Sequence, residues 1–327
     1  MLDLMPLYEE VGGYNYSLPK KFMEDFFTGV AFGNQRYTER EQADLDADIL
    51  NIYARVLQKA EQLQVGKEKW VNISAGSPGC GKTTVLGEAV DPDALCLKQM
   101  ELTYLKELKA GLKTLEEEVF ATEAEREQAE KAIRLKMYNK WRPGSNAGCQ
   151  WILAHLIKKK LPFNYGTTCS SPMTGGFLKF LQDHGYKIRI VHVTAPDEVR
   201  VESIKIRDKQ FVQTTDDDIR EKGRLVPQRL NDTFLRYADE IEFYYRGAPE
   251  ESATLAATWL RYDKQEESKE GPGFKFTVHN HQKLQSIQEV HDSIIKTLTP
   301  KEMEALKIKD VSEIFWEKLM PQNAAVQ

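Results

Sequence analysis

The sequence is poor in cysteine, and its four cysteines lie scattered at positions 80, 96, 149 and 169 without a CxxC pair. A disulfide framework needs denser cysteines, so this sparse usage predicts a reducing, cytoplasmic location. The chain also lacks any run of about 18 apolar residues, which excludes a membrane-spanning helix. Its first residues show neither the basic start nor the apolar stretch of a secretory signal.

An excess of positive charge is missing as well. The 327 residues carry 45 Lys and Arg against 50 Asp and Glu, a net charge of −5. A nucleic-acid-binding protein normally presents a basic field, so this balance argues against nucleic acid as a partner. Apolar residues make up 41% of the chain, which is enough for a sizeable core and excludes a disordered protein.

Short runs rich in β-branched residues alternate with helical patterns. Strand-like runs cover residues 70–75, 163–165, 187–193 and 241–245, and apolar stripes with helical spacing cover 41–63, 149–159 and 174–184. Residues 98–140 read as two helices, which we expect to form a hairpin. This alternation predicts an α/β fold, in which helices cover both faces of a parallel sheet.

A glycine-rich loop follows the first predicted strand and precedes a helical pattern. It matches G-x-x-x-x-G-K-[ST] at every fixed position, and it comprises Gly76, Ser77, Pro78, Gly79, Cys80, Gly81, Lys82 and Thr83. Glycines let the backbone turn its N–H groups towards phosphate oxygens. We expect Lys82 to contact the β- and γ-phosphates, Thr83 to bind Mg²⁺, and Thr84 to contribute to nucleotide binding. The simpler alternative is a glycine turn before a helix.

Other motifs narrow the class of P-loop protein. The sequence has no N-K-x-D motif, which GTPases of the Ras type use to read the base. No predicted strand consists of four apolar residues ending in Asp, as the second acidic motif of motor-type ATPases requires. The sequence therefore favours a P-loop kinase that acts on a small molecule.

Several short segments carry a resemblance to a known family. They are Val71–Leu86, Asp91–Ala94, Arg142, Gly166–Thr168, Gly185–Pro196, Arg207 and Lys222–Arg224, which together span about residues 70–245. Their residue types and order resemble the zeta-toxin family of P-loop kinases. The resemblance implies ATP or GTP with Mg²⁺, and transfer of the γ-phosphoryl group to an alcohol group. The best-known acceptor in that family is a UDP-linked amino sugar.

The resemblance also implies roles for single residues and for a partner. Asp93 matches the aspartate that activates the acceptor hydroxyl, and Arg207 and Arg224 match lid arginines that contact the phosphates, with Arg229 as the alternative to Arg224. Zeta-type toxins have an inhibitory, antitoxin-like protein partner, so the resemblance implies one here.

Two departures from the family pattern leave alternatives open. Tyr165 stands where the family often has a carboxylate. The stretch from Thr83 to Asp91 is short for a helix and a strand, so Asp91 or Glu101 is an alternative to Asp93 as the acid. Asp93 could equally cap a helix that begins at the next residue.

Three further residues are candidates for acceptor binding. Arg142 is either a substrate anchor or one half of a cation–aromatic pair with Trp141. Thr167 and Thr168 follow a predicted strand at the edge of the sheet where ligands bind, and they are candidates to hold the acceptor or the waters of Mg²⁺. The simpler interpretation of the two threonines is a turn that caps the next helix.

The sequence thus predicts three parts and two functions. The parts are a helical N-terminal extension (1–66), a P-loop kinase domain (67–248) with a helical insertion (98–140), and an α/β or helical C-terminal appendage (249–327). The first function is a kinase that phosphorylates a small hydroxyl compound. The alternative is a regulatory protein that binds nucleotide and has lost the chemistry. Neither the acceptor nor the choice between ATP and GTP follows from the sequence.

Overall fold

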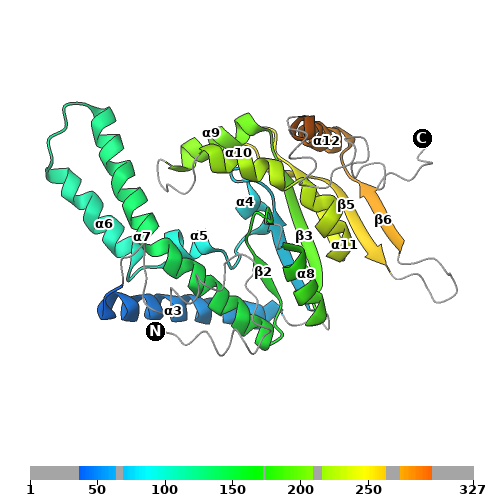
Figure 1. The fold of residues 1–327 in the computed structure, drawn as a ribbon, viewed down its shortest axis with the longest axis horizontal. Helices are drawn as coiled ribbons and strands as arrows, with labels where there is room; N and C mark the ends of the chain where they lie inside the picture. The colour runs from blue at the N-terminus through cyan, green and yellow to red at the C-terminus, as the bar shows by residue number, and fades with distance from the viewer. Residues whose placement is uncertain (1–36, 64–68, 172–173, 209–215, 263–272, 297–327) are drawn as a thin grey trace. The chain divides into compact units, whose positions relative to one another are not determined.

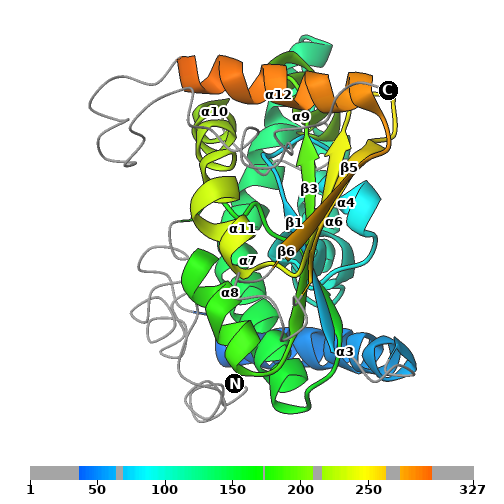
Figure 2. The same cartoon turned by 90° about the vertical axis from the view of Figure 1, so that its right-hand side faces the viewer.

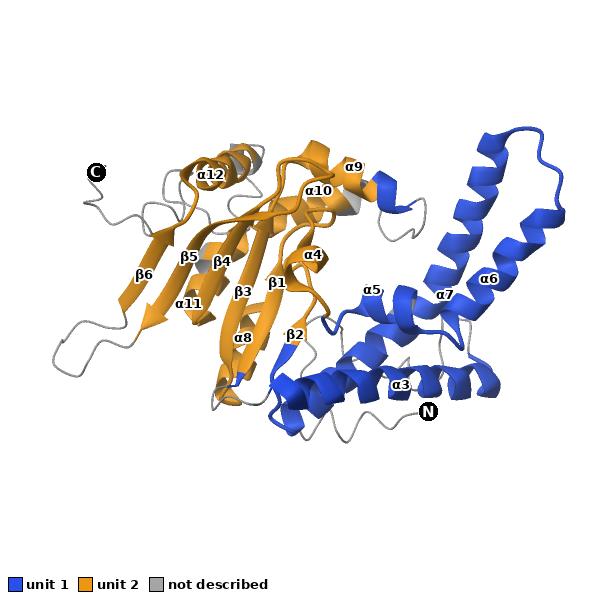
Figure 3. Ribbon diagram, turned by 180° about the vertical axis from the view of Figure 1, so that it is seen from behind, with its two compact units in different colours: residues 1–69, 89–163, 205–213 blue, residues 70–88, 164–204, 214–327 orange. Residues whose placement is uncertain are grey.

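The structure is a computed structural model, and it describes residues 37–63, 69–171, 174–208, 216–262 and 273–296. Parts of the predicted N-terminal extension (1–36 and 64–66) and of the predicted C-terminal appendage (263–272 and 297–327) lie outside these residues. The chain divides into two compact units (Figure 3). Unit 1 comprises residues 1–69, 89–163 and 205–213, and unit 2 comprises residues 70–88, 164–204 and 214–327.

Unit 2 is built on a six-stranded sheet with the strand order β2-β1-β3-β4-β5-β6 (Figure 1). The strands are β1 (Trp70–Ala75), β2 (Phe163–Tyr165), β3 (Lys187–Thr194), β4 (Glu240–Tyr245), β5 (Thr254–Tyr262) and β6 (Gly273–Val278). β3 runs parallel to β1 and β4, whereas β5 and β6 are antiparallel to their neighbours. The four predicted strands are therefore present, and β5 and β6, in the predicted C-terminal appendage, extend the same sheet.

Helices cover both faces of this sheet because its central strands are apolar on both faces. Ile188, Ile190 and Val193 of β3 are each at most 1% exposed, although Val193 lies on the opposite face from the two isoleucines. Where Figure 2 shows the sheet nearly edge-on, α8, α10 and α11 lie on one side and α4 on the other. The helices of unit 2 are α4 (Lys82–Leu86), α8 (Thr174–Asp183), α9 (Asp197–Asp208, which runs into unit 1), α10 (Asp216–Leu225), α11 (Leu235–Tyr237) and α12 (His281–Lys296), with a π-helical turn at Leu230–Phe234. The predicted fold class is confirmed.

The carboxyl ends of the parallel strands meet at one edge of the sheet. Two hydrogen bonds join β1 and its following loop to the segment after β2: Ser74 bonds with Thr167, and Gly76 bonds with Thr168. The residue number therefore rises in the same direction along both segments. β1 and β2 therefore also run parallel. Ligands of open α/β sheets bind outside this edge, and the loops that leave β1, β2, β3 and β4 all begin there.

Unit 1 is helical. Its elements are α3 (Glu39–Leu63), α5 (Pro92–Ala94), a π-helical turn (Leu95–Gln99), α6 (Tyr104–Thr114), a 3₁₀ turn (Leu115–Glu117) and α7 (Glu123–Lys158). α6 and α7 pack against each other and form the predicted hairpin. Thr122 begins α7 as its cap, because its hydroxyl accepts a hydrogen bond from the N–H of Glu125 at 3.2 Å.

One helix is longer than the sequence pattern indicates. α7 continues from the hairpin through Pro143 to Lys158 as one helix of 36 residues, although residues 141–148 carry no clear apolar stripe. Packing against α3 explains the continuation. A Cβ atom on Gly144 would lie 2.8 Å from Leu45, and one on Gly148 would lie 2.7 Å from Ile49, so the two glycines let the helices approach closely.

α3 is tied to the start of α6 by a buried carboxylate. Asp48 is 2% exposed and accepts hydrogen bonds from the backbone N–H groups of Leu102 and Thr103, each at 3.0 Å. The Thr103 hydroxyl donates to the same carboxylate at 2.7 Å.

Among the residues that the structure describes, no helix is long and apolar enough to span a membrane. The predicted division at residues 66 and 248 stays a prediction.

Candidate functional site

The glycine-rich loop connects β1 to α4 in unit 2, as its sequence predicts. Gly79 adopts a φ of +83°, which L side chains rarely adopt, and a Cβ atom there would lie 2.4 Å from the carbonyl oxygen of Arg200. The ammonium group of Lys82 donates a hydrogen bond to the Ser77 carbonyl at 2.9 Å, so it lies over the loop. The loop therefore has both the backbone turn and the cation that phosphate binding requires.

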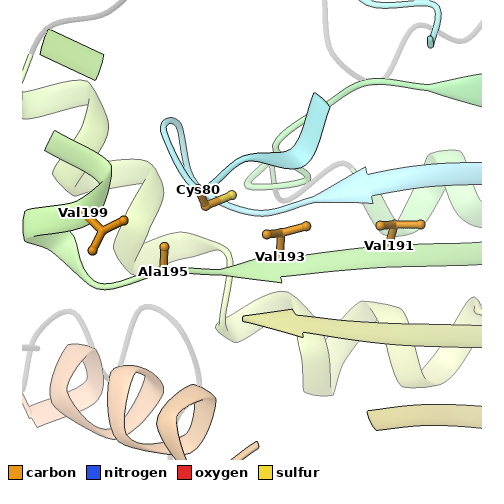
Figure 4. Packing of buried hydrophobic residues seen from close by; sticks show 5 residues of the cluster. All are labelled: Cys80, Val191, Val193, Ala195 and Val199. Carbon is orange, nitrogen blue, oxygen red and sulfur yellow. The ribbon is translucent and has the colours of Figure 1, made fainter. Parts of the chain in front are cut away.

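Cys80 anchors the loop to the sheet. Its side chain is fully buried and packs with Val191, Val193, Ala195 and Val199, which belong to β3 and the segment after it (Figure 4). The thiol is thus part of the core. By contrast, Thr83 and Thr84 in the first turn of α4 are exposed.

α4 is short, and two asparagines define its end. The amide of Asn164, in β2, donates to the carbonyls of Leu86 at 3.4 Å and Glu88 at 3.1 Å. Asn72 of β1 donates in turn to Asn164 at 2.9 Å. These bonds hold the chain that leaves α4 against the sheet edge, and no strand lies between α4 and Asp91 in this described stretch apart from a single bridge residue, Val90.

The predicted hydroxyl cluster lies directly beside the loop. The N–H of Gly76 donates to the Thr168 carbonyl at 3.1 Å. The Thr168 hydroxyl lies 2.9 Å from that of Ser170, and the Thr167 hydroxyl accepts a hydrogen bond from the Cys169 N–H at 3.3 Å. The two threonine hydroxyls thus already take part in hydrogen bonds within the turn. Both threonine residues are half-buried at the carboxyl end of β2.

Tyr165 offers no carboxylate at the end of β2. It is 6% exposed, and its ring packs edge-on against Phe177 with ring centroids 5.5 Å apart. Its role is therefore in the core. The family carboxylate has no counterpart at this position.

A small cavity of about 20 Å³ lies between the loop and the carboxyl end of β3. Its walls include Ser77, Thr194, Arg200 and two histidines, His192 and His291. The Nε2 atoms of the two histidines lie 3.4 Å apart, and the Thr194 hydroxyl lies 3.2 Å from Nε2 of His192. A cavity of this size holds about one water molecule.

Unit 1 brings Asp93 and Arg142 together. The Arg142 guanidinium forms an ion pair with the Asp93 carboxylate, and the Tyr138 hydroxyl donates to the same carboxylate at 3.2 Å. Arg142 also lies over the Tyr138 ring, 5.7 Å from its centroid. The Asp93 side chain remains 37% exposed. The cation–aromatic partner of Arg142 is thus Tyr138 rather than Trp141.

Asp91 and Asp93 have different surroundings. Asp91 caps α5, because its carboxylate accepts hydrogen bonds from the N–H groups of Asp93 at 2.7 Å and Ala94 at 2.9 Å. Burial raises the pKa of Asp91, and the neighbouring charge of Asp93 raises it further. The capping role that the sequence left open for Asp93 therefore belongs to Asp91, and the Asp93 carboxylate is directed to side chains. Glu101 is exposed.

The lid candidates lie on α9 and α10. Arg207, in the last turn of α9, pairs with Asp208 at 3.3 Å, and Arg224 lies in the last turn of α10. Arg229 is 8% exposed and donates to the Ser170 carbonyl at 3.4 Å, which places it beside the hydroxyl cluster. The loop, Thr167, Thr168 and Arg224 belong to unit 2, and Asp93, Arg142 and Arg207 belong to unit 1.

Two arginines at the loop were not predicted as site residues. Arg200 is 2% exposed, donates to the Ile219 carbonyl at 3.0 Å and pairs with Asp197, so it joins α9 to α10. Arg246 donates to the Gly79 carbonyl at 3.1 Å. The available signal for Arg246 was its position directly after a predicted strand, at the edge where ligands bind. In the described residues no group of three or more His, Cys, Asp or Glu side chains could hold a metal ion.

Comparisons with known proteins agree with this fold. The family model described as Zeta toxin matches residues 125–243, which include Arg142 and Arg224 but not the glycine-rich loop. The matched stretch is similar to the zeta-toxin family. No curated protein matches the chain in sequence.

Solved structures resemble the chain at low sequence identity. A structure of AvrRxo1-ORF1:AvrRxo1-ORF2 with sulphate ions is 11% identical with a TM-score of 0.50, and the match covers 83% of this chain and 85% of that chain. The same complex with ATP is 12% identical with a TM-score of 0.50, covering 81% and 75%. A structure from the PezAT toxin–antitoxin system of Streptococcus pneumoniae is 15% identical with a TM-score of 0.44, covering 84% and 95%. The first two likenesses show a shared fold.

Proposed function

We propose that the chain is an ATP- or GTP-dependent kinase that transfers the γ-phosphoryl group to a hydroxyl group of a small molecule. The observation that carries this proposal is the loop between β1 and α4, with Lys82 over its backbone and Gly79 in a conformation that only glycine adopts readily. The similarity of residues 125–243 to the zeta-toxin family supports a kinase, since that family transfers phosphoryl groups to alcohols. The structure with ATP that shares the fold supports a triphosphate ligand.

In this proposal the loop residues bind the nucleotide phosphates and Mg²⁺. The loop N–H groups and Lys82 would hold the β- and γ-phosphates. The Thr83 hydroxyl is exposed and has no hydrogen-bond partner in the described part of the chain. It suits Mg²⁺, which takes oxygen ligands and keeps several waters. When bound, Mg²⁺ would neutralise phosphate charge.

Transfer forms a bond between the acceptor oxygen and the γ-phosphorus and breaks the bond from that phosphorus to the bridging oxygen. Asp93 is the proposed acceptor of the hydroxyl proton, because its side chain is 37% exposed and its carboxylate is held by Arg142. The transition state is loose, so orientation of the hydroxyl matters more than full deprotonation. Arg207 and Arg224 are the proposed partners of the transferred group, and Arg142, Thr167 and Thr168 the proposed contacts of the acceptor.

A phosphorylation screen in a metabolite extract tests this function. The wild-type protein with ATP or GTP labelled in the γ-position should transfer label to a small molecule, and Lys82→Ala should transfer none. Asp93→Asn should bind nucleotide as the wild type does but react about 100-fold or more slowly, the usual contribution of general base catalysis. Full activity of Asp93→Asn would remove the assignment of the acid. If the labelled acceptor is a nucleotide sugar, the chain resembles the zeta toxins in its substrate as well.

A second function is favoured by Tyr165. Because this buried tyrosine replaces the family carboxylate, the chain could bind nucleotide without transferring its phosphoryl group and act on a protein partner instead. Labelled phosphate on any metabolite would decide against this function. Tight nucleotide binding without transfer, over the full extract, would favour it.

The proposal includes an inhibitory, antitoxin-like protein partner. The two solved structures with a TM-score of 0.50 are both of AvrRxo1-ORF1 with AvrRxo1-ORF2. Co-purification of a second protein with the full chain from its native host, followed by loss of phosphoryl transfer on adding it back, would support the partner. Transfer at an unchanged rate in its presence would contradict inhibition.

A further inference from the structure

Arg246 connects three backbone carbonyls from two segments of unit 2. It is the first residue after β4, and its backbone N–H donates to the Thr194 carbonyl at the end of β3 at 3.0 Å. Its guanidinium donates to the Gly79 carbonyl at 3.1 Å, to the Glu251 carbonyl at 3.0 Å and to the Pro249 carbonyl. The side chain therefore joins the turn between β4 and β5 to the glycine-rich loop.

The contact between Arg246 and Gly79 lies in the part of the loop whose N–H groups would bind phosphate. A trans peptide directs its carbonyl and its N–H in opposite directions. Because the Gly79 carbonyl is held towards Arg246, the N–H of Cys80 in the same peptide is held away from it, where it donates to the Ser77 carbonyl at 3.4 Å. A Cβ atom on Gly81 would lie 3.2 Å from Arg246 Cδ, so the arginine also packs against the next turn of the loop.

We infer that Arg246 is a positioning residue of the nucleotide site. It fixes the orientation of the Gly79–Cys80 peptide and couples the turn of residues 246–251 to phosphate binding by the loop. Its half-buried charge lies on the outside of the loop and adds to the positive field there. This inference rests on the proposed nucleotide binding, and it concerns the phosphate tail of the ligand rather than the base.

The chain offers a matched control in Arg261. This arginine of β5 is also half-buried and donates to two backbone carbonyls, those of Ala238 at 3.0 Å and Leu235 at 2.6 Å, but it contacts no part of the loop. Arg261→Ala should therefore cost similar folding stability and leave nucleotide binding unchanged. Arg246→Ala should affect both.

Calorimetric titration of the full chain with Mg·ATP and with inorganic tripolyphosphate tests the inference. For Arg246→Ala, Kd should rise about ten-fold or more for both ligands by the same factor, which corresponds to losing one hydrogen bond from a charged donor. Arg246→Lys keeps the charge but cannot join three carbonyls, so it should recover only part of the affinity. Arg261→Ala should stay within about two-fold of the wild type.

Each outcome has a distinct meaning. If the wild type binds ATP and Arg246→Ala binds both ligands as tightly as Arg261→Ala does, the inference fails and the proposed function stands. A loss for ATP but not for tripolyphosphate would also overturn it, because the arginine would then act on the nucleoside. If the wild type binds neither ligand, the proposed function and the inference fail together. Should Arg246→Ala not fold, Arg246→Lys decides by the same comparison.

Discussion

Lowering the pH should destabilise unit 2 through the histidine pair beside the loop. His192 of β3 is 1% exposed and His291 of α12 is 2% exposed, and their Nε2 atoms lie 3.4 Å apart. Burial lowers the pKa of His192 well below its usual value, and the charges of His291 and Lys82 lower it further. Burial also lowers the pKa of His291 to about 3. Both side chains are therefore neutral in the folded protein.

The sign and size of the effect follow from these directions. Below about pH 6.5 the unfolded chain binds protons that the folded chain excludes, so the free energy of unfolding falls as the pH falls. At about pH 5.5, one pH unit below the usual pKa of histidine, proton binding by the two side chains in the unfolded chain lowers the free energy of unfolding by about 3 kcal/mol in total. Above about pH 6.5 the contribution disappears, because both states then leave the histidines neutral.

Urea unfolding of the full chain at about pH 7.5 and about pH 5.5 measures this loss. The double variant His192→Gln with His291→Gln should lose about 3 kcal/mol less than the wild type between the two conditions. His281→Gln is the matched control, because His281 is exposed at the start of α12, and it should behave as the wild type does. The reasoning is refuted if the double variant and the wild type lose the same free energy.

Three further predictions concern single residues. Asp48→Ala removes three hydrogen bonds and should lower the free energy of unfolding by about 3 kcal/mol or more, measured by urea unfolding; a change near zero would contradict the role of this carboxylate. Gly79→Ala forces a side chain into a left-handed conformation against the Arg200 carbonyl, so Mg·ATP affinity should fall by about ten-fold or more in calorimetry, and unchanged affinity would refute the loop geometry. Arg142→Ala leaves Asp93 without its cation, so transfer should slow while nucleotide affinity stays the same; equal rates would remove Arg142 from the site.

Local sequence patterns were sufficient to predict the central strands and the glycine-rich loop of unit 2. β3 could be predicted because its run of β-branched residues lies between Gly185 and Pro196, and both boundaries are set by the chain itself. The loop was predictable for the same reason, since its glycines and Lys82 are needed at fixed spacing whatever surrounds them. These features depend on residues that are close together in the chain.

Features that depend on distant residues could not be predicted. The continuation of α7 through Pro143 needs α3 as a packing partner, and the sequence pattern between 141 and 148 carries no sign of it. Asp93 and Arg142 were each candidates, but their ion pair joins residues 49 positions apart. The contact of Arg246 with the loop spans 167 positions, so only the tertiary structure shows it.

The most direct test of the account is calorimetric titration of the full chain with Mg·ATP and Mg·GTP, with Lys82→Ala as the control. The account predicts saturable binding of at least one triphosphate by the wild type and binding weaker by about ten-fold or more in the variant, because Lys82 is the cation over the loop. An absence of binding by the wild type, or equal binding by Lys82→Ala, would contradict it.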